Sequence, residues 1–82
     1  MADDLCSSVA KAARQAMKAR QEGVPIDQMM EQAEKFDGDT RELAKQMVLT
    51  AYERDRRFSP SMQEREIVEF GNEMYMHCTK LN

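Results

Sequence analysis

Apolar residues along this chain of 82 residues recur at spacings of three and four, which is the period of a helix that packs on one side. No stretch alternates in the way that a half-buried strand does. Turn-forming residues interrupt the period at "EGVPI" (22–26), "FDGDT" (36–40) and "FSPS" (58–61). The pattern therefore predicts four helices, over roughly 3–22, 26–36, 40–56 and 60–79, in a single helical domain of residues 1–82.

Each predicted helix has one apolar stripe, and the stripes predict the core. In the first helix the stripe is Leu5, Val9, Ala12, Ala13, Ala16 and Met17, with Cys6 at its edge. In the third it is Leu43, Ala44, Met47, Val48, Ala51 and Tyr52, and in the fourth it is Ile67, Gly71, Met74, Cys78 and Leu81. In the short second helix Met30, Ala33 and Phe36 are expected to point inward. Asp39 with Glu42, and Ser61 with Glu64, have the spacing of a capping box at a helix start.

Composition supports a globular helical chain. Apolar residues make up 41% and charged residues 33%, which is more apolar than a disordered chain would be. The net charge of -3 disfavours a nucleic-acid partner because the phosphate backbone is negative as well. No run of apolar residues is long enough to predict a membrane span.

The two cysteines, Cys6 and Cys78, lie near opposite ends of the chain and both fall on apolar stripes. Short connections between four helices make the first and last helices antiparallel, which would place these two positions side by side. We therefore expect a disulfide between them, in an all-α bundle whose first and last helices it joins. The alternative is a pair of buried free thiols, because an unpaired cysteine behaves as a small hydrophobic residue.

A structural disulfide favours an oxidising compartment. The chain shows no signal peptide, so we expect it to correspond to the mature form of a periplasmic or secreted protein. If "MADD" is a native start instead, the location would be cytoplasmic.

His77 stands beside Cys78, but neighbouring residues in a helix point about 100° apart and make a poor pair of metal ligands. The chain has no other histidine and one other cysteine. We therefore expect no metal, no cofactor and no catalytic residue, and His77 should lie on the surface.

Charged residues cluster by sign. Lys11, Arg14 and Lys18 share a face of the first helix, while Glu66, Glu69 and Glu73 form an acidic row on the fourth. The favoured interpretation is that both rows are solvated faces. One alternative is that they pair between the first and fourth helices, and another is that the basic face binds a partner.

Two further features of the sequence lead to expectations about exposure and packing. Met62 and Met76 fit the apolar stripes poorly, and the alternative for them is exposure on an adaptable contact surface, although core filling is the favoured use of the methionines. Gly71, inside the fourth stripe, predicts the close approach of another backbone, since glycine is otherwise costly in a helix.

Several stretches resemble a group of small exported proteobacterial proteins of uncharacterised function. They are the early cysteine, "ARQEGVPIDQMME" (19–31), "AYERDRRFS" (51–59) and "EFGNEMYMHC" (69–78). Members of that group are all-helical once the signal peptide is removed and carry a cysteine near each end. The resemblance covers most of the chain and implies export and a disulfide, but it brings no catalytic residues with it.

These observations predict a small exported helical protein that acts through contact with an unknown protein partner and is not an enzyme. One alternative is a periplasmic protein like the acid-stress chaperones. With every carboxyl group protonated, the 12 Lys and Arg residues and the single His would be left to repel one another and loosen the bundle. A second alternative is a cytosolic or phage-encoded regulatory module with reduced thiols. The sequence does not indicate an oligomeric state.

Overall fold

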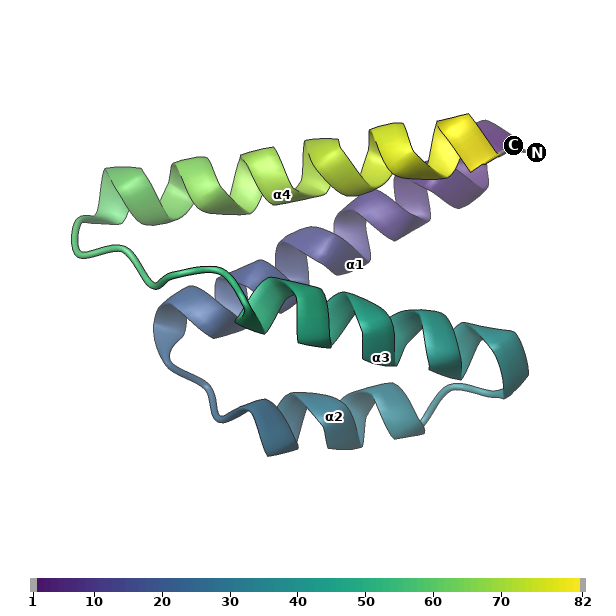
Figure 1. Ribbon diagram of the computed structural model, residues 1–82, viewed down its shortest axis with the longest axis horizontal. Coiled ribbons are helices and arrows are strands. Elements are labelled where there is room, and N and C mark those ends of the chain that lie inside the picture. Colours follow the sequence, from purple (N-terminus) through teal and green to yellow (C-terminus); the bar gives the residue numbers. More distant parts are fainter. Residues whose placement is uncertain (1, 82) are drawn as a thin grey trace.

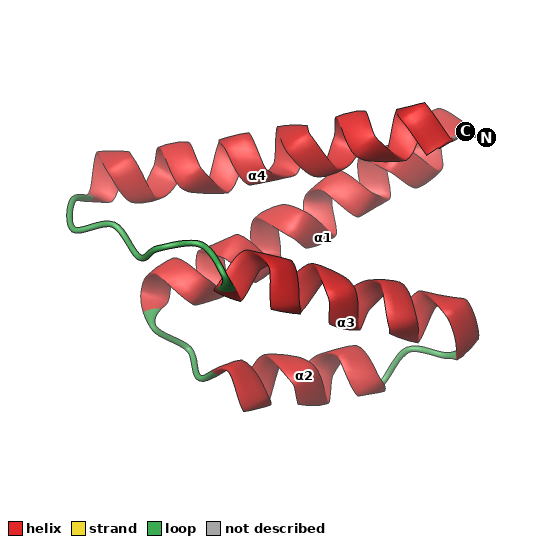
Figure 2. Cartoon of the chain, viewed as in Figure 1, coloured by secondary structure: helices red, strands yellow, loops and turns green. Residues whose placement is uncertain are grey.

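The computed structural model describes residues 2–81, which form four helices and no strand (Figures 1 and 2). The helices are α1 (Ala2–Glu22), α2 (Ile26–Glu34), α3 (Gly38–Tyr52) and α4 (Pro60–Leu81). The predicted all-α fold is therefore confirmed. Short turns connect α1 to α2 and α2 to α3, whereas residues 53–59 form a longer linker between α3 and α4 (Figure 2).

Helices α1 and α4 are antiparallel and pack along most of their lengths, so that the two ends of the chain lie together (Figure 1). Cys6 and Cys78 join them through a disulfide, with the two Cα atoms 5.5 Å apart. The predicted covalent link between the first and last helices is thus confirmed. Helices α2 and α3 form a hairpin, and α3 packs against α1.

The core lies where α1, α3 and α4 meet. Its buried members are Ala13, Ala16, Met17, Met47, Ala51 and Phe70. Alanines on α1 allow the neighbouring helices to come close, and the ring of Phe70 fills the space between them. Most of the predicted stripes thus meet in the core, but several stripe residues at one end of the molecule do not, as described below.

Both predicted capping boxes are wrong, although α4 begins at residue 60 as predicted. Helix α3 begins at Gly38, which has a φ of +54°, and Asp37 precedes it without a capping hydrogen bond from its side chain. At the start of α4 the hydroxyl of Ser59 accepts a hydrogen bond from the Met62 amide at 3.2 Å, so Ser59 caps this helix and Ser61 does not. Proline at the first helical position needs no partner for its nitrogen, which explains the start at Pro60.

The interpretation of Gly71 is corrected in part. The glycine is buried as expected, but its close neighbour is the side chain of Arg14 and not a backbone. A methyl group at Gly71 would lie 2.7 Å from Cγ of Arg14. The aliphatic stem of Arg14 therefore runs over Gly71 and contributes to packing between α1 and α4.

The last turn of α1 is fixed by hydrogen bonds to the linker. Gln21 is 2% exposed, and its amide nitrogen donates to the carbonyl of Asp55 at 2.9 Å. Its amide oxygen accepts from the backbone nitrogen of Arg57 at 2.7 Å. The Arg56 guanidinium donates to the backbone carbonyl of Gln21, so hydrogen bonds to the linker hold both the side chain and the backbone of this residue. We call this region, made of residues 19–25 and 52–59, the closed end.

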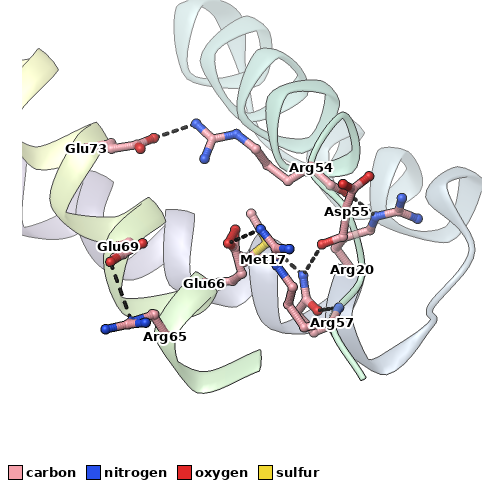
Figure 3. A network of polar contacts seen from close by, with 10 residues as sticks. Met17, Arg20, Arg54, Asp55, Arg57, Arg65, Glu66, Glu69 and Glu73 are labelled. Carbon is pink, nitrogen blue, oxygen red and sulfur yellow. Dashed lines mark hydrogen bonds and ion pairs between the residues drawn. The ribbon is translucent and has the colours of Figure 1, made fainter. Parts of the chain in front are cut away.

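Arg20 and Tyr52 extend this network. Arg20 Nε donates to the Arg54 carbonyl at 2.9 Å (Figure 3). Its guanidinium also lies over the Tyr52 ring, at 5.5 Å from the centroid. The Tyr52 hydroxyl donates to the Val24 carbonyl at 2.7 Å, which ties the α1–α2 turn to the end of α3. Burial raises the pKa of Tyr52, so its hydroxyl stays protonated and able to donate.

The alternative in which charges pair between α1 and α4 is wrong. Figure 3 shows that the acidic row of α4 pairs with other residues: Arg57 bonds Glu66 at 3.2 Å and Arg54 bonds Glu73 at 2.5 Å. Glu69 faces Arg65 one turn earlier in its own helix. The basic partners thus come from the linker and from α4 itself, and within residues 2–81 no lysine of α1 takes part in an ion pair.

Candidate functional site

The opposite end of the molecule, where α1 begins and α4 finishes, is built differently. There the Cys6–Cys78 disulfide ties α1 to α4. Cys6 is fully buried and Cys78 is half-buried, while His77 is exposed as the sequence predicted. We call this region the open end, made of residues 5–16 of α1, 29–36 of α2 and its following turn, 40–50 of α3 and 74–81 of α4.

The hairpin of α2 and α3 leaves a hollow against α1 at the open end. Its volume is about 510 Å³, and α1, α2 and α3 each supply part of its lining. The lining is mainly apolar and includes Leu5, Val9, Met29, Phe36, Leu43 and Met47. Helices α1 and α2 barely contact each other, so α3 forms the floor between them.

A second hollow, of about 400 Å³, lies between α1, α3 and α4. It shares Leu5, Val9, Leu43 and Met47 with the first, and adds residues of α4 that include Met74. Because the two hollows share these four lining residues, they form one continuous apolar surface, which we call the open-end groove. Cys78 and His77 border its α4 side.

The edges of the groove expose large apolar side chains to solvent. Leu5 is 55% exposed, Phe36 50% and Leu43 49%. By contrast, Met17 of α1 and Ala51 of α3, which lie nearer the closed end of these helices, are fully buried. These exposures correct the prediction that Leu5, Leu43 and Phe36 belong to the core. Phe36 lies beyond the end of α2, so the helical phase used to place it inward does not apply.

Two more residues of the predicted apolar stripes, Ala12 and Leu81, are exposed and do not belong to the core. Ala12 lines the groove, and Leu81, at the end of α4, is 74% exposed. Met62 and Met76 are 42% and 53% exposed, so the alternative of exposure holds for these two methionines and core filling does not. Phe58, in the linker at the closed end, is fully exposed as well, so exposed apolar side chains are found at both ends. The open end differs because its exposed apolar residues line a hollow.

The lining of the groove lacks acidic residues, although the chain as a whole has a net charge of -3. Among the lining side chains that the structure describes, Lys35 and His77 are the ionisable ones, and no Asp or Glu is present. The remaining polar lining comes from neutral groups such as Ser8, Gln15 and Gln32. An apolar surface edged with neutral and basic groups suits binding, whereas acid–base chemistry normally draws on a positioned carboxylate or a buried histidine.

The search for a metal centre gives no candidate: within residues 2–81, no group of three or more His, Cys, Asp or Glu side chains is placed to hold an ion. Over the same stretch, each helix is too short or too polar to cross a membrane. The groove itself was missed by sequence reasoning. The sequence held one signal of it: the apolar stripes of α1 and α3 extend into the first turns of these helices, beyond the residues that form the core.

Comparisons of this chain with protein-family models, with curated proteins and with solved structures found no match.

Proposed function

We propose that this chain is a binding protein, not an enzyme, that holds part of a partner protein in the open-end groove. The observation that carries the proposal is the exposure of Leu5, Phe36 and Leu43 along one apolar hollow. Apolar patches that are hollowed and bordered by polar groups mark interaction sites in soluble proteins. Burial of these side chains by a partner would supply the main favourable free energy of binding.

We further propose that the protein works in the periplasm or outside the cell. The disulfide supports this location, because such bonds persist in oxidising compartments and are rare in the cytosol. It also ties down the α1 and α4 walls of the groove, which gives the bond a direct role in shaping the binding surface.

Site-directed photo-crosslinking tests the binding site. A photoreactive amino acid replaces Leu43, on the groove, or Leu49, which is 41% exposed in the same helix and does not line it. We expect a discrete protein adduct from position 43 in cells that make the protein, and little adduct from position 49. Equal adducts from both positions, or none from either, would contradict the proposal.

An acid-responsive chaperone is the second candidate, because the ion pairs that join different elements all depend on carboxylates. Glu34 pairs with Lys45 between α2 and α3, and Glu66 and Glu73 pair with the linker. In strong acid, at about pH 2–3, loss of these carboxylate charges would weaken all three links. Protection of an aggregating client at this pH but not at neutral pH supports the chaperone, and no protection eliminates it.

A cytosolic regulatory module would keep Cys6 and Cys78 reduced in the cell. The discriminating measurement is the mass of the protein, trapped with a thiol-blocking reagent as cells are opened. An exported protein stays unmodified and gains two hydrogens only after reduction. Modification at both cysteines without prior reduction would overturn the proposed location while leaving the groove proposal standing.

A further inference from the structure

From the shape and charge of the first hollow, we propose that its occupant is an amphipathic helix with acidic residues along its edges. This inference rests on the proposed function and specifies the partner segment. Three sets of observations carry it: the length of the walls, the exposure of their edges, and the charge of the rims on α1 and α2.

The length of the hollow suits a helix. On α1 its lining runs from Leu5 to Ala16, which corresponds to about 17 Å at 1.5 Å per residue. That is three helical turns, the span over which a docked helix places apolar anchors at positions i, i+3 or i+4, and i+7. The floor on α3, from Thr40 to Val48, is shorter, at about 12 Å or two turns.

The exposed edges favour a helix over an acyl chain. Leu5 and Phe36, on opposite walls, remain about half exposed, so the hollow is open along its length. A lipid tail lying in it would keep one side in water. An amphipathic helix buries one face, covers both edges and keeps its polar face solvated.

The α1 rim is polar and basic. Ser8 and Gln15 line the hollow, and Lys11 lies between them at spacings of three and four, which places it on the same helix face. Lys18 follows Gln15 by three residues and continues the row. All four residues are exposed. Since the acidic row of α4 pairs elsewhere, these two lysines are available to a partner.

The α2 rim faces this row with the same sign of charge. Gln32 and Lys35 line the hollow, and the ammonium of Lys35 donates to Gln32 Oε1 at 3.5 Å, a weak contact that a carboxylate would replace readily. Of the acidic residues nearby on α2, Glu34 is held by Lys45 of α3. Glu31 lies one turn before Lys35 on the same side of the helix, but it does not line the hollow, whereas Lys35 does. A chain of net charge -3 therefore borders this hollow with lysines on both sides.

Two labelled peptides of about 16 residues, long enough to span the hollow as helices, test the inference. Both carry the same leucine anchors on one face, and their edges are either glutamates or lysines. Fluorescence anisotropy measures binding to the intact, disulfide-bonded protein. We expect the glutamate-edged peptide to bind about tenfold more tightly, because each of a few exposed ion pairs adds a small factor. The difference should shrink as salt is added.

Charge reversal supplies the matched control. Lys11→Glu with Lys35→Glu should reverse the preference, so that the lysine-edged peptide binds better. Arg65→Glu with Lys80→Glu makes the same change in net charge on exposed positions of α4, and should leave the preference unchanged. Circular dichroism of each variant confirms that the helices are retained. Equal affinity for the two peptides, or a preference that the α4 variants also reverse, overturns the inference.

Further outcomes separate this inference from the proposed function. If neither peptide binds but position 43 still crosslinks to a protein, the helix is overturned and the binding protein stands. If both tests are negative, both proposals fail. Dimerisation that Leu43→Asp abolishes and Leu49→Asp does not would assign the groove to a second copy of the chain. Saturable binding of oleate with no binding of either peptide would assign it to an acyl chain.

Discussion

Where α1 ends, the linker of residues 53–59 wraps the helix with hydrogen bonds from Gln21, Arg20 and Arg56, whereas where α1 begins, one disulfide ties it to α4. At the closed end, hydrogen bonds satisfy the buried amide of Gln21 and the linker backbone that faces it, and the buried Nε of Arg57 is the exception, without a partner within residues 2–81. At the open end, α3 has no such tie to α1 or α4 among the described contacts, and the hairpin of α2 and α3 leaves room between the helices.

The same helices therefore serve two purposes along their length. In α3, Ala51 is fully buried near the closed end, and Leu43, two turns earlier, is 49% exposed. A bundle sealed at both ends would bury both residues and would have no groove. We infer that the closed end supplies the packing and polar order that allow the open end to keep apolar surface exposed.

Removal of the disulfide, at the open end, should lower the free energy of unfolding more than any of the other changes that we propose. The bond closes a loop with a sequence separation of 72, so the variant Cys6→Ala with Cys78→Ala should lose up to about 4 kcal/mol of unfolding free energy. Hydrogen exchange should accelerate first in residues 5–9 and 74–81, at the open end. Denaturation with and without reductant gives the control, because reduced wild-type protein should match the variant. Equal stability of all forms would show that noncovalent contacts hold the open end.

The substitution Gln21→Leu, at the closed end, should cause the second-largest loss of stability. The substitution leaves the Asp55 carbonyl and the Arg57 amide without their partner, at a cost of about 3 kcal/mol for two buried polar groups. Gln15→Leu, on the exposed rim of the groove, is the matched control and should change stability by less than about 0.5 kcal/mol. The amide of Arg57 should lose protection from exchange in the first variant alone. Similar costs for the two variants would erase the distinction between the ends.

The helices could be predicted from the sequence because their period, turns and composition agree. The pairing of Cys6 with Cys78 followed from topology, since an antiparallel first and last helix places those positions together. Helix starts were less certain because several residues near each turn can cap. Asp39 and Ser61 had the right spacing, but a backbone that turns earlier, at Gly38 and Pro60, leaves them inside the helices.

The groove could not be predicted from the sequence. An apolar stripe shows which face of a helix turns inward, but it does not show whether a neighbour lies close enough to cover it, as at Leu43. Gln21 was missed for the opposite reason, since a glutamine near a helix end is ordinarily a surface residue. Its burial depends on the path of the linker, and "ERDRR" (53–57) gave no sign of that path beyond an ending helix.

Two glycines in left-handed turns give a smaller and matched test of the two ends. Gly23, at the closed end, has a φ of +83°, and Gly38, in the turn that carries the open end of the hairpin, has a φ of +54°. Alanine at either position should cost about 1 kcal/mol from backbone strain. At Gly23 the new methyl would also lie 3.1 Å from the Arg56 guanidinium, while at Gly38 it meets no atom within 4 Å. Thermal unfolding should therefore show the larger loss for Gly23→Ala, and equal losses would mean that the Arg56 contact is unimportant.

The ion pair of Glu34 with Lys45 should give the smallest effect, because both side chains are partly exposed. The hydrogen bond from Lys45 holds the pKa of Glu34 below its ordinary value. A lowered folded-state pKa means that the pair stabilises the fold above the pKa of the unfolded chain, and that this contribution disappears as the pH falls through the folded-state pKa. Lys45→Met should raise the pKa of Glu34 toward its ordinary value, as followed by the carbon chemical shift of its carboxyl group in NMR titration. Since this pair joins α2 to α3 and touches neither α1 nor α4, the variant should leave the Gln21 hydrogen bonds at the closed end intact. An unchanged pKa would show that the hairpin of α2 and α3, the wall and floor of the groove, is held by its apolar contacts alone.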